Sequence, residues 1–159
     1  MELDKEKILD YQKNRSPYLM IDHVTKVIPG KLSEGYKLLD ENEWFFKVHW
    51  ENDPNMPGML QLEALVQMAS ISIFTLDGNK GKTAYLTNVN NAKFIKKILP
   101  GERLELKTKI ISFKRGLAKC YGEGFVKKNL AINDLCSPFC STFNALCPYT
   151  CSLITCLCL

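Results

Sequence analysis

The chain has 159 residues, of which 46% are hydrophobic and 24% charged, and its formal net charge is +4. This composition is typical of one ordinary soluble domain that is long enough to bury a core. Lysines and arginines alternate with acids along most of the chain, so no basic block marks a nucleic-acid surface. We therefore expect a single domain that binds no nucleic acid, with a mildly basic face that would suit an acidic protein partner.

The N-terminus and the cysteines indicate the compartment. Residues 1–10 mix acids and lysines and lack the apolar core of a signal peptide, which predicts a cytoplasmic protein. Six of the seven cysteines lie between Cys136 and Cys158, and only Cys120 precedes them. The body of the chain is therefore cysteine-poor, as is usual for an intracellular protein.

The first third of the chain predicts a helix and two strands. Residues 2–13 place apolar side chains among charges at roughly helical spacing, which predicts a short helix. Residues 18–28 are rich in β-branched side chains and end at Pro29-Gly30, which predicts a strand and a turn. Residues 33–48 continue the extended pattern, as a second strand and an aromatic approach segment.

The middle of the chain predicts a long buried helix and three strands. Residues 57–76 hold apolar side chains on every face, as in a helix buried on all sides. Pro57 suits its first turn, where a missing NH costs nothing. Three β-rich segments follow, near 82–95, 102–114 and 116–128. We therefore predict an α+β fold in which an antiparallel sheet is wrapped around one long central helix.

The C-terminal stretch, residues 129–159, differs from the domain predicted for residues 1–128. After Lys128 there is no lysine or arginine, and Asp134 is the only acid. From Leu135 on, cysteine, serine, threonine, proline and leucine follow one another without helical or strand periodicity. We therefore predict an atypical Cys-rich tail, either non-native or disordered, and no final strand near residues 129–140.

Two other interpretations of this tail are weaker. Prolines and hydroxyl residues interrupt its apolar run, which makes a membrane span a poor fit. A zinc site could be built from Cys136, Cys140, Cys147 and Cys151, but three-residue gaps without histidine are a weak signal for zinc. We therefore predict no metal site.

Glu63 is the first candidate for chemistry. It lies in the middle of the apolar helix, so its carboxyl group should be largely desolvated, which is costly. A buried carboxyl group usually has a raised pKa and can act as a general acid near neutral pH. The alternative is a structural glutamate that binds nearby backbone or an arginine.

His49 and Gly58 are the other two candidates. His49 is placed at the end of the aromatic segment, before a loop that turns the chain back toward the helix, so His49 and Glu63 can face one cleft. His23, on the first strand, is the more ordinary kind of histidine. Gly58 begins the helix, where a free backbone NH can donate to a carbonyl oxygen that gains negative charge. Pro57-Gly58 can equally be a helix-start signal alone.

The run from His49 to Ala64, H-W-E-N-D-P-N-M-P-G-M-L-Q-L-E-A, resembles the signature of bacterial 3-hydroxyacyl-acyl-carrier-protein dehydratases of the FabZ type. The family pattern is H-F-P-x-x-P-x-M-P-G-x-L-x-x-E-A, with the histidine and glutamate at this spacing. Residues 15–24, 42–46 and 92–104 also look like family segments, so the resemblance covers residues 1–128.

The resemblance implies a hot-dog fold and assigns roles to three residues of the site. His49 matches the catalytic histidine, Glu63 the catalytic carboxylate, and Gly58 the glycine whose NH holds the thioester carbonyl. In the family, the histidine and glutamate of one site come from different subunits of a dimer, and dimers often assemble as a trimer. The acyl chain lies in a tunnel at the dimer interface. Our candidates for its wall, which would also suit ordinary core positions, are Met59, Leu60, Leu62, Val66 and Phe94.

The resemblance also implies a partner and a mechanism. In the family, a basic stretch helps to attract the acidic acyl carrier protein. The residues of this chain that match it are Lys93, Lys96, Lys97 and Arg103. A solvated charged face is an equal interpretation of these four residues. We expect neutral His49 to remove a proton next to the thioester carbonyl, and Glu63 to assist departure of the 3-hydroxyl group. Such an elimination uses proton transfers alone, so we predict no cofactor.

Departures from the family pattern leave alternatives open. Val48-His49-Trp50-Glu51 replaces the usual G-H-F-P and can reshape the tunnel mouth. Asp53-Pro54 and Gln61-Leu62 look like the related FabA type, whose carboxylate is an aspartate, whereas Glu63 favours FabZ. The alternative functions are a hot-dog thioesterase, with Glu63 activating water, and a non-catalytic module that binds acyl carrier protein or acyl chains.

Overall fold

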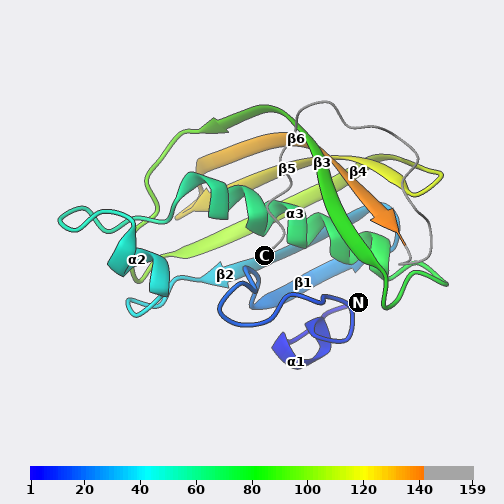
Figure 1. Cartoon of the computed structure of the whole chain (residues 1–159), viewed down its shortest axis with the longest axis horizontal. Helices are drawn as coiled ribbons and strands as arrows, with labels where there is room; N and C mark the ends of the chain where they lie inside the picture. The colour runs from blue at the N-terminus through cyan, green and yellow to red at the C-terminus, as the bar shows by residue number, and fades with distance from the viewer. Residues whose placement is uncertain (142–159) are drawn as a thin grey trace.

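The structure, a computed structural model, describes residues 1–141, with side chains for residues 1–135. A six-stranded antiparallel sheet, in the order β1-β2-β4-β5-β6-β3, curves around one long helix, α3 (Figure 1). This arrangement is the hot-dog fold, and the predicted α+β architecture is confirmed.

The elements have the following bounds. The helices are α1 (Lys5–Ile8), α2 (Trp44–Val48) and α3 (Gly58–Phe74). The strands are β1 (His23–Ile28), β2 (Leu32–Leu38), β3 (Thr83–Phe94), β4 (Arg103–Lys114), β5 (Leu117–Val126) and β6 (Asn129–Ser141). The three strands predicted in the middle of the chain are confirmed as β3, β4 and β5.

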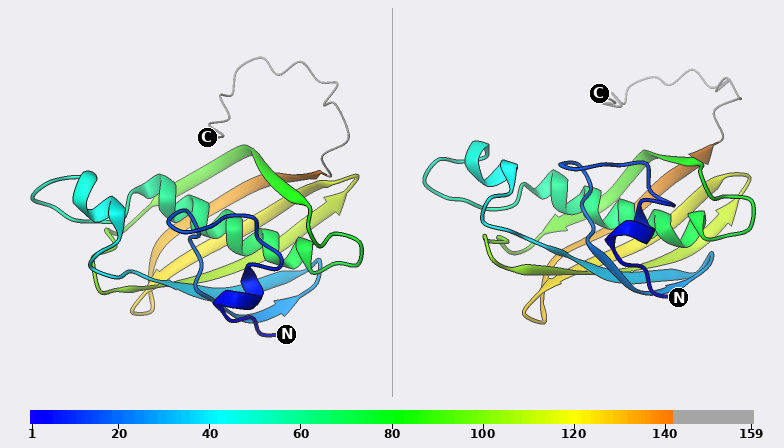
Figure 2. Two further views of the ribbon diagram at one scale, coloured as in Figure 1. Left: turned by 60° about the horizontal axis from the view of Figure 1, so that its bottom comes forward. Right: turned by 90° about the horizontal axis from the view of Figure 1, so that it is seen from below.

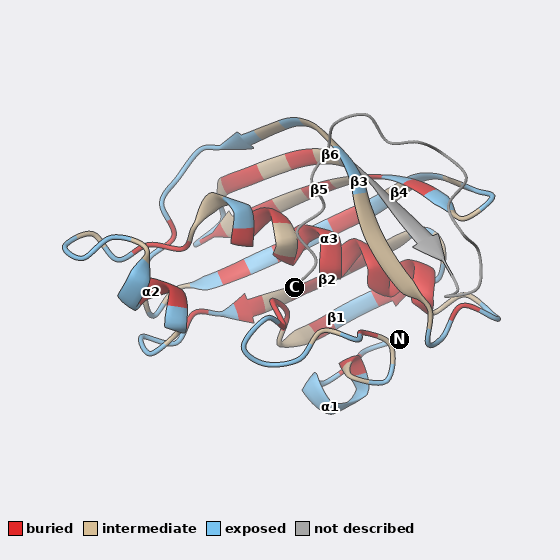
Figure 3. Ribbon diagram, viewed as in Figure 1, coloured by how far each residue is buried: buried red, intermediate tan, exposed pale blue. Residues whose placement is uncertain are grey.

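Helix α3 is buried on nearly all sides, as its sequence predicted (Figure 3). Only Gly58, Met59 and Glu63 within it are not buried. The sheet covers one side, and the segment between α1 and β1 crosses the other (Figure 2). Among the described helices, none combines the length and the apolar character that crossing a membrane would require.

Helix α3 approaches the sheet closely at Gly35 in β2. A Cβ atom at Gly35 would lie 2.1 Å from the His23 carbonyl oxygen and 2.7 Å from Met68 Cε. Both distances are below van der Waals contact, so no larger residue fits there without displacing the helix or β1. This contact helps to fix α3 in the concave face of the sheet.

The prediction that no strand follows residue 128 is wrong. β6 lies between β5 and β3 and pairs with both of them. Val126 pairs with Asn129, so Lys127 and Lys128 form a two-residue turn, in which both have positive φ, 50° and 69°. The remainder of the predicted tail, residues 142–159, lies outside the described residues, as do the side chains of the four cysteines considered for zinc.

Two predicted segments have different structures. The approach segment predicted as extended contains α2, so His49 follows a short helix rather than an aromatic strand. The predicted first strand begins only at His23, because residues 18–21 run along α3 instead of along the sheet. The predicted N-terminal helix is short, and Leu3 forms a bridge with Val24.

Candidate active site

The imidazole of His49 is held in one orientation. Its backbone NH donates to the Phe45 carbonyl at 3.0 Å, which places His49 at the C-terminal end of α2. Its Nδ1 atom lies 3.0 Å from the backbone carbonyl oxygen of Asn55. Because a carbonyl oxygen only accepts hydrogen bonds, Nδ1 carries the hydrogen. In the neutral ring Nε2 therefore holds the lone pair, as a general base requires.

The loop after His49 is attached to the segment that follows β3. The Trp50 ring stacks on the imidazole, with ring centroids 4.9 Å apart. Lys97 forms an ion pair with Asp53, and its Nζ lies 5.9 Å from the Trp50 ring centroid. The backbone NH of Met56 donates to the Ile98 carbonyl at 2.8 Å. These contacts join the two segments at the end of the molecule where α3 begins (Figure 1).

Glu63 lies in a partly buried position on α3. Its Oε1 atom accepts a hydrogen bond from Gln67 Nε2 at 2.7 Å. Burial raises the pKa of Glu63, and the hydrogen bond from Gln67 offsets only part of this rise. The raised pKa favours a protonated carboxyl group, which is the form that a general acid needs.

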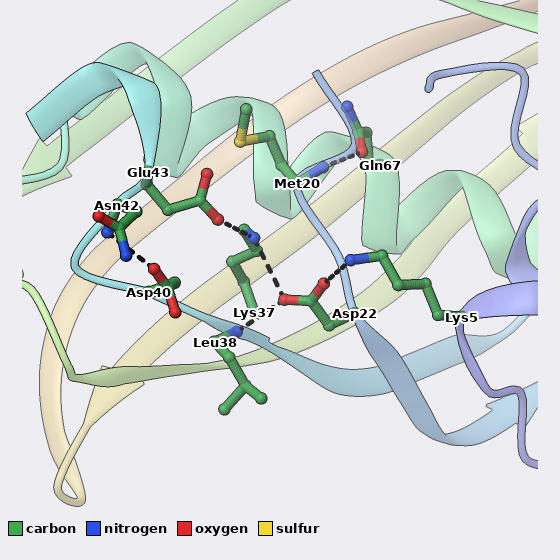
Figure 4. A network of polar contacts seen from close by, with 9 residues as sticks. All are labelled: Lys5, Met20, Asp22, Lys37, Leu38, Asp40, Asn42, Glu43 and Gln67. Carbon is green, nitrogen blue, oxygen red and sulfur yellow. Dashed lines mark hydrogen bonds and ion pairs between the residues drawn. The ribbon is translucent and has the colours of Figure 1, made fainter. Parts of the chain in front are cut away.

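Gln67 fixes the place of this carboxyl group. Its side chain also donates to the Tyr18 carbonyl at 2.9 Å. It accepts from the Met20 NH at 2.8 Å, as Figure 4 shows. The partner of Glu63 is thus this amide, rather than the backbone or arginine considered from sequence. Gln67 was missed in the sequence, although its position four residues after Glu63 on a helix is a usable signal.

Gly58 is the first residue of α3, and its NH therefore has no acceptor within the helix. A Cβ atom at this position would lie 3.0 Å from two carbons of the Phe94 ring. Phe94 is itself 49% exposed. The structure thus brings Gly58 and Phe94 together at the N-terminal end of α3.

The other candidate residues divide into groups. Leu60, Leu62 and Val66 are buried, whereas Met59 is 66% exposed. Lys93, Lys96 and Lys97 are all exposed, at the end of β3 and just beyond it. Arg103 lies apart from them, because its guanidinium group covers the Tyr36 ring on the outer face of the sheet.

Within one chain, the described hydrogen bonds do not join His49 to Glu63. The imidazole is bonded to Asn55, and the carboxyl group to Gln67. Among the residues that the structure describes, no group of three or more histidine, cysteine or acidic side chains is placed to hold a metal ion.

Comparison with known proteins decides the family. Residues 13–133 match the FabA-like domain. A curated 3-hydroxyacyl-[acyl-carrier-protein] dehydratase FabZ of Clostridium novyi is 41% identical over 114 residues, which cover 72% of this chain and 80% of that protein. The FabZ of Clostridium acetobutylicum is 38% identical over 136 residues, or 82% and 96% of the two chains. This chain belongs to the FabZ family.

Solved structures confirm the hot-dog fold of this FabZ-family chain. The dehydratase heterocomplex ApeI:P from Xenorhabdus doucetiae has a TM-score of 0.73 at 10% identity, over 86% of this chain and 91% of that one. The protein PH1136 from Pyrococcus horikoshii has a TM-score of 0.64 at 11% identity, over 87% and 93%. At these identities the likeness concerns the fold alone.

The raised pKa of Glu63 predicts how the stability of this FabZ-family chain changes with pH. The folded state binds this proton more tightly than the unfolded chain, where the pKa is near 4.5. The stabilisation is therefore complete below the unfolded pKa and is lost as pH rises through the folded pKa. Glu63→Gln should remove this loss, so the variant should gain stability relative to wild type as pH rises. Urea unfolding at a series of pH values measures the free energy of unfolding of both proteins. A difference between them that stays constant with pH would contradict this prediction.

Proposed function

We propose that this chain catalyses the dehydration of 3-hydroxyacyl thioesters, carried on acyl carrier protein, to trans-2-enoyl thioesters. Membership of the FabZ family supports the reaction, because the relatives carry that activity in their names. The observation that carries the proposal is that the chain supplies both groups: His49, whose Nε2 carries the lone pair of the neutral ring, and Glu63, whose pKa burial raises. An elimination of water needs one base and one acid of this kind.

The proposed mechanism uses three groups of the protein. His49 Nε2 takes the proton from the carbon next to the thioester carbonyl, and the Gly58 NH stabilises the charge that develops on the carbonyl oxygen. Protonated Glu63 gives its proton to the 3-hydroxyl group, the C–O bond breaks, and water leaves as the double bond forms. Elimination of water leaves the net oxidation state of the substrate unchanged, so the proposed reaction needs no redox cofactor.

We further propose that each site is shared between two subunits of a homodimer, and that dimers can assemble as a trimer. The bonds of His49 and Glu63 to different partners within one chain support a site completed by a second copy. Large apolar side chains are also exposed at the end of the molecule where α3 begins, as an interface with a second subunit would require. They are Trp44, Val48, Trp50, Met59, Phe94, Ile95 and Leu99.

The substrate and its carrier would approach at this end. The acyl chain would lie along Met59, Leu60, Leu62, Val66 and Phe94. The exposed Lys93, Lys96 and Lys97 would attract an acidic carrier protein in the cytoplasm. Arg103 contributes less to this surface, since its guanidinium group lies apart from the three lysines, over the Tyr36 ring.

An assay of product identity tests the proposed reaction. Purified protein incubated with 3-hydroxyacyl carrier protein should yield the enoyl thioester, detected by its absorbance and by the mass of the carrier. Release of the free acid would instead indicate a thioesterase. Binding of the carrier protein without turnover would indicate a non-catalytic module. Either of these two results contradicts the proposal.

A further inference from the structure

Lys37 is a lysine whose side chain lies in the interior. It belongs to β2, on the face that packs against α3, and only 5% of its surface is exposed. Its neighbours Tyr36 and Leu38 lie on the outer face, as the alternation of a strand requires. Burying an ammonium group is costly unless opposite charges compensate it. The partners of this lysine therefore decide what it does.

The Lys37 ammonium group lies between two carboxylates (Figure 4). It donates a hydrogen bond to Glu43 Oε1 and lies 3.2 Å from Asp22 Oδ2. Asp22 also accepts hydrogen bonds from Lys5 Nζ at 2.8 Å and from the Leu38 NH at 2.9 Å. Burial acts to raise the pKa of Asp22, but the bond from Lys5 and the charge of Lys37 bring it below its usual value. Asp22 is thus held in its charged form, which compensates the ammonium group of Lys37.

Glu43 connects this ion network to α2. It is the residue directly before Trp44, the first residue of the helix, yet its side chain makes no capping bond to the helix. Helix α2 has five residues, far fewer than an isolated helix needs for stability in water. Its position is therefore set from outside, by the burial of Phe45 and Phe46 and by the bond between Glu43 and Lys37.

His49 lies at the opposite end of the same helix. Its backbone NH is bonded to the Phe45 carbonyl, so it continues the helical turn. With a rise of about 1.5 Å per residue, His49 lies roughly 9 Å along the axis from Glu43. This distance is about 1.7 helical turns. Backbone hydrogen bonds from the Phe46 NH to the Glu43 carbonyl and from the His49 NH to the Phe45 carbonyl connect the two ends, so we expect a shift at Glu43 to reach the imidazole. Misplacing a reacting group by about 1 Å can lower a rate by about 10²-fold.

We propose that Lys37 is a positioning residue for His49. By holding Glu43, it fixes the start of α2 and, through that helix, the place of the imidazole ring. This inference rests on the catalytic role proposed for His49. Lys37 acts through other residues and does not contact the substrate.

The kinetic test compares Lys37→Met with the matched control Lys5→Met. Both changes remove a cation bonded to Asp22, but only Lys37 is also bonded to Glu43. Lys37→Met should lower kcat by about 10-fold or more and leave KM nearly unchanged. Lys5→Met should keep the wild-type kcat, because the described bond of Lys5 is to Asp22 and not to Glu43, the residue that begins α2.

Histidine ring signals in an NMR spectrum give a second measurement, which does not depend on turnover. The chain has two histidines, and the His49→Ala spectrum identifies which signals belong to His49. Lys37→Met should displace the His49 signals, whereas Lys5→Met should leave them in place. Unmoved His49 signals in a folded Lys37→Met protein would overturn the proposal at any measured rate.

A second variant, Glu43→Gln, tests the same bond if Lys37→Met does not fold. Glu43→Gln leaves Lys37 paired with Asp22, and it should displace the His49 signals and lower kcat in the same direction. Full kcat in both folded variants, with His49→Ala inactive, would overturn the positioning role alone. An active His49→Ala protein would instead overturn the catalytic role of His49, which is a different failure.

Discussion

His49→Ala is expected to lower kcat for dehydration by about 10²–10⁴-fold, the range for loss of a general acid–base group. The substitution removes the Nε2 lone pair that takes the substrate proton, and no other described histidine lies in α2 or the loop after it. The fold should persist, since His49 is only partly buried and its side chain has one hydrogen bond, to a carbonyl oxygen. Steady-state kinetics and circular dichroism measure the two effects.

His23→Ala is the matched control for this experiment. His23 belongs to β1, where its Nε2 is 2.7 Å from Glu2 Oε1 and its ring stacks on Tyr36. Both residues are histidines, but only His49 lies near the start of α3. Removal of His23 should therefore leave kcat close to wild type. Full activity of His49→Ala, or equal losses in the two variants, would contradict the assignment of His49 as the base.

Mixing two inactive variants is expected to restore activity if a site takes His49 from one subunit and Glu63 from the other. His49→Ala and Glu63→Gln should each be nearly inactive alone. A mixed dimer has one site that lacks both groups and one site that is intact. After subunit exchange at equal concentrations, the mixture should therefore recover about a quarter of wild-type activity.

The matched control is the double variant His49→Ala/Glu63→Gln mixed with wild type. Its mixed dimers carry one missing group in each site, so exchange should reduce the activity below that of unmixed wild type. If each site were built within one chain, the two single variants would never restore activity. Such a result, with subunit exchange shown by mass spectrometry, would contradict the shared site.

The sequence predicted the central helix and the middle strands because their signals are local and strong. The α3 segment is apolar on every face, and β4 and β5 alternate between buried and exposed residues. α2 was missed because its Trp-Phe-Phe run suits a strand as well as a helix. Burial of Phe45 and Phe46, a tertiary effect, stabilises the helix there.

The final strand was missed because its turn carries none of the usual signals. Lys127 and Lys128 both adopt positive φ, which glycine and asparagine favour and lysine does not. Asn129 follows the turn rather than forming it. A run of cysteine, serine and proline then hides the strand from propensity arguments, so only pairing with β5 and β3 reveals it.

The sequence predicted the residues of the candidate site from their types and spacing. It did not predict the contacts that hold those residues in place. The spacing of His49, Gly58 and Glu63 is visible in the letters of the sequence. The bond that selects the histidine tautomer comes from the backbone carbonyl of Asn55, which any residue could supply. Likewise, the bonds of Gln67 to residues 18–20 depend on a segment 47 or more residues away.

The order of the strands has a consequence for synthesis on the ribosome. Among the described strands, β3 lies at one edge of the sheet and pairs with β6 alone, so Thr83 has its strand partner, Ser141, only after β6 has been synthesised. A nascent chain that ends before residue 129 can join β1, β2, β4 and β5, but one flank of α3 still lies open. The growing polypeptide therefore exposes apolar surface of α3 until β6 emerges from the ribosome. We expect chaperones to be needed most during that interval.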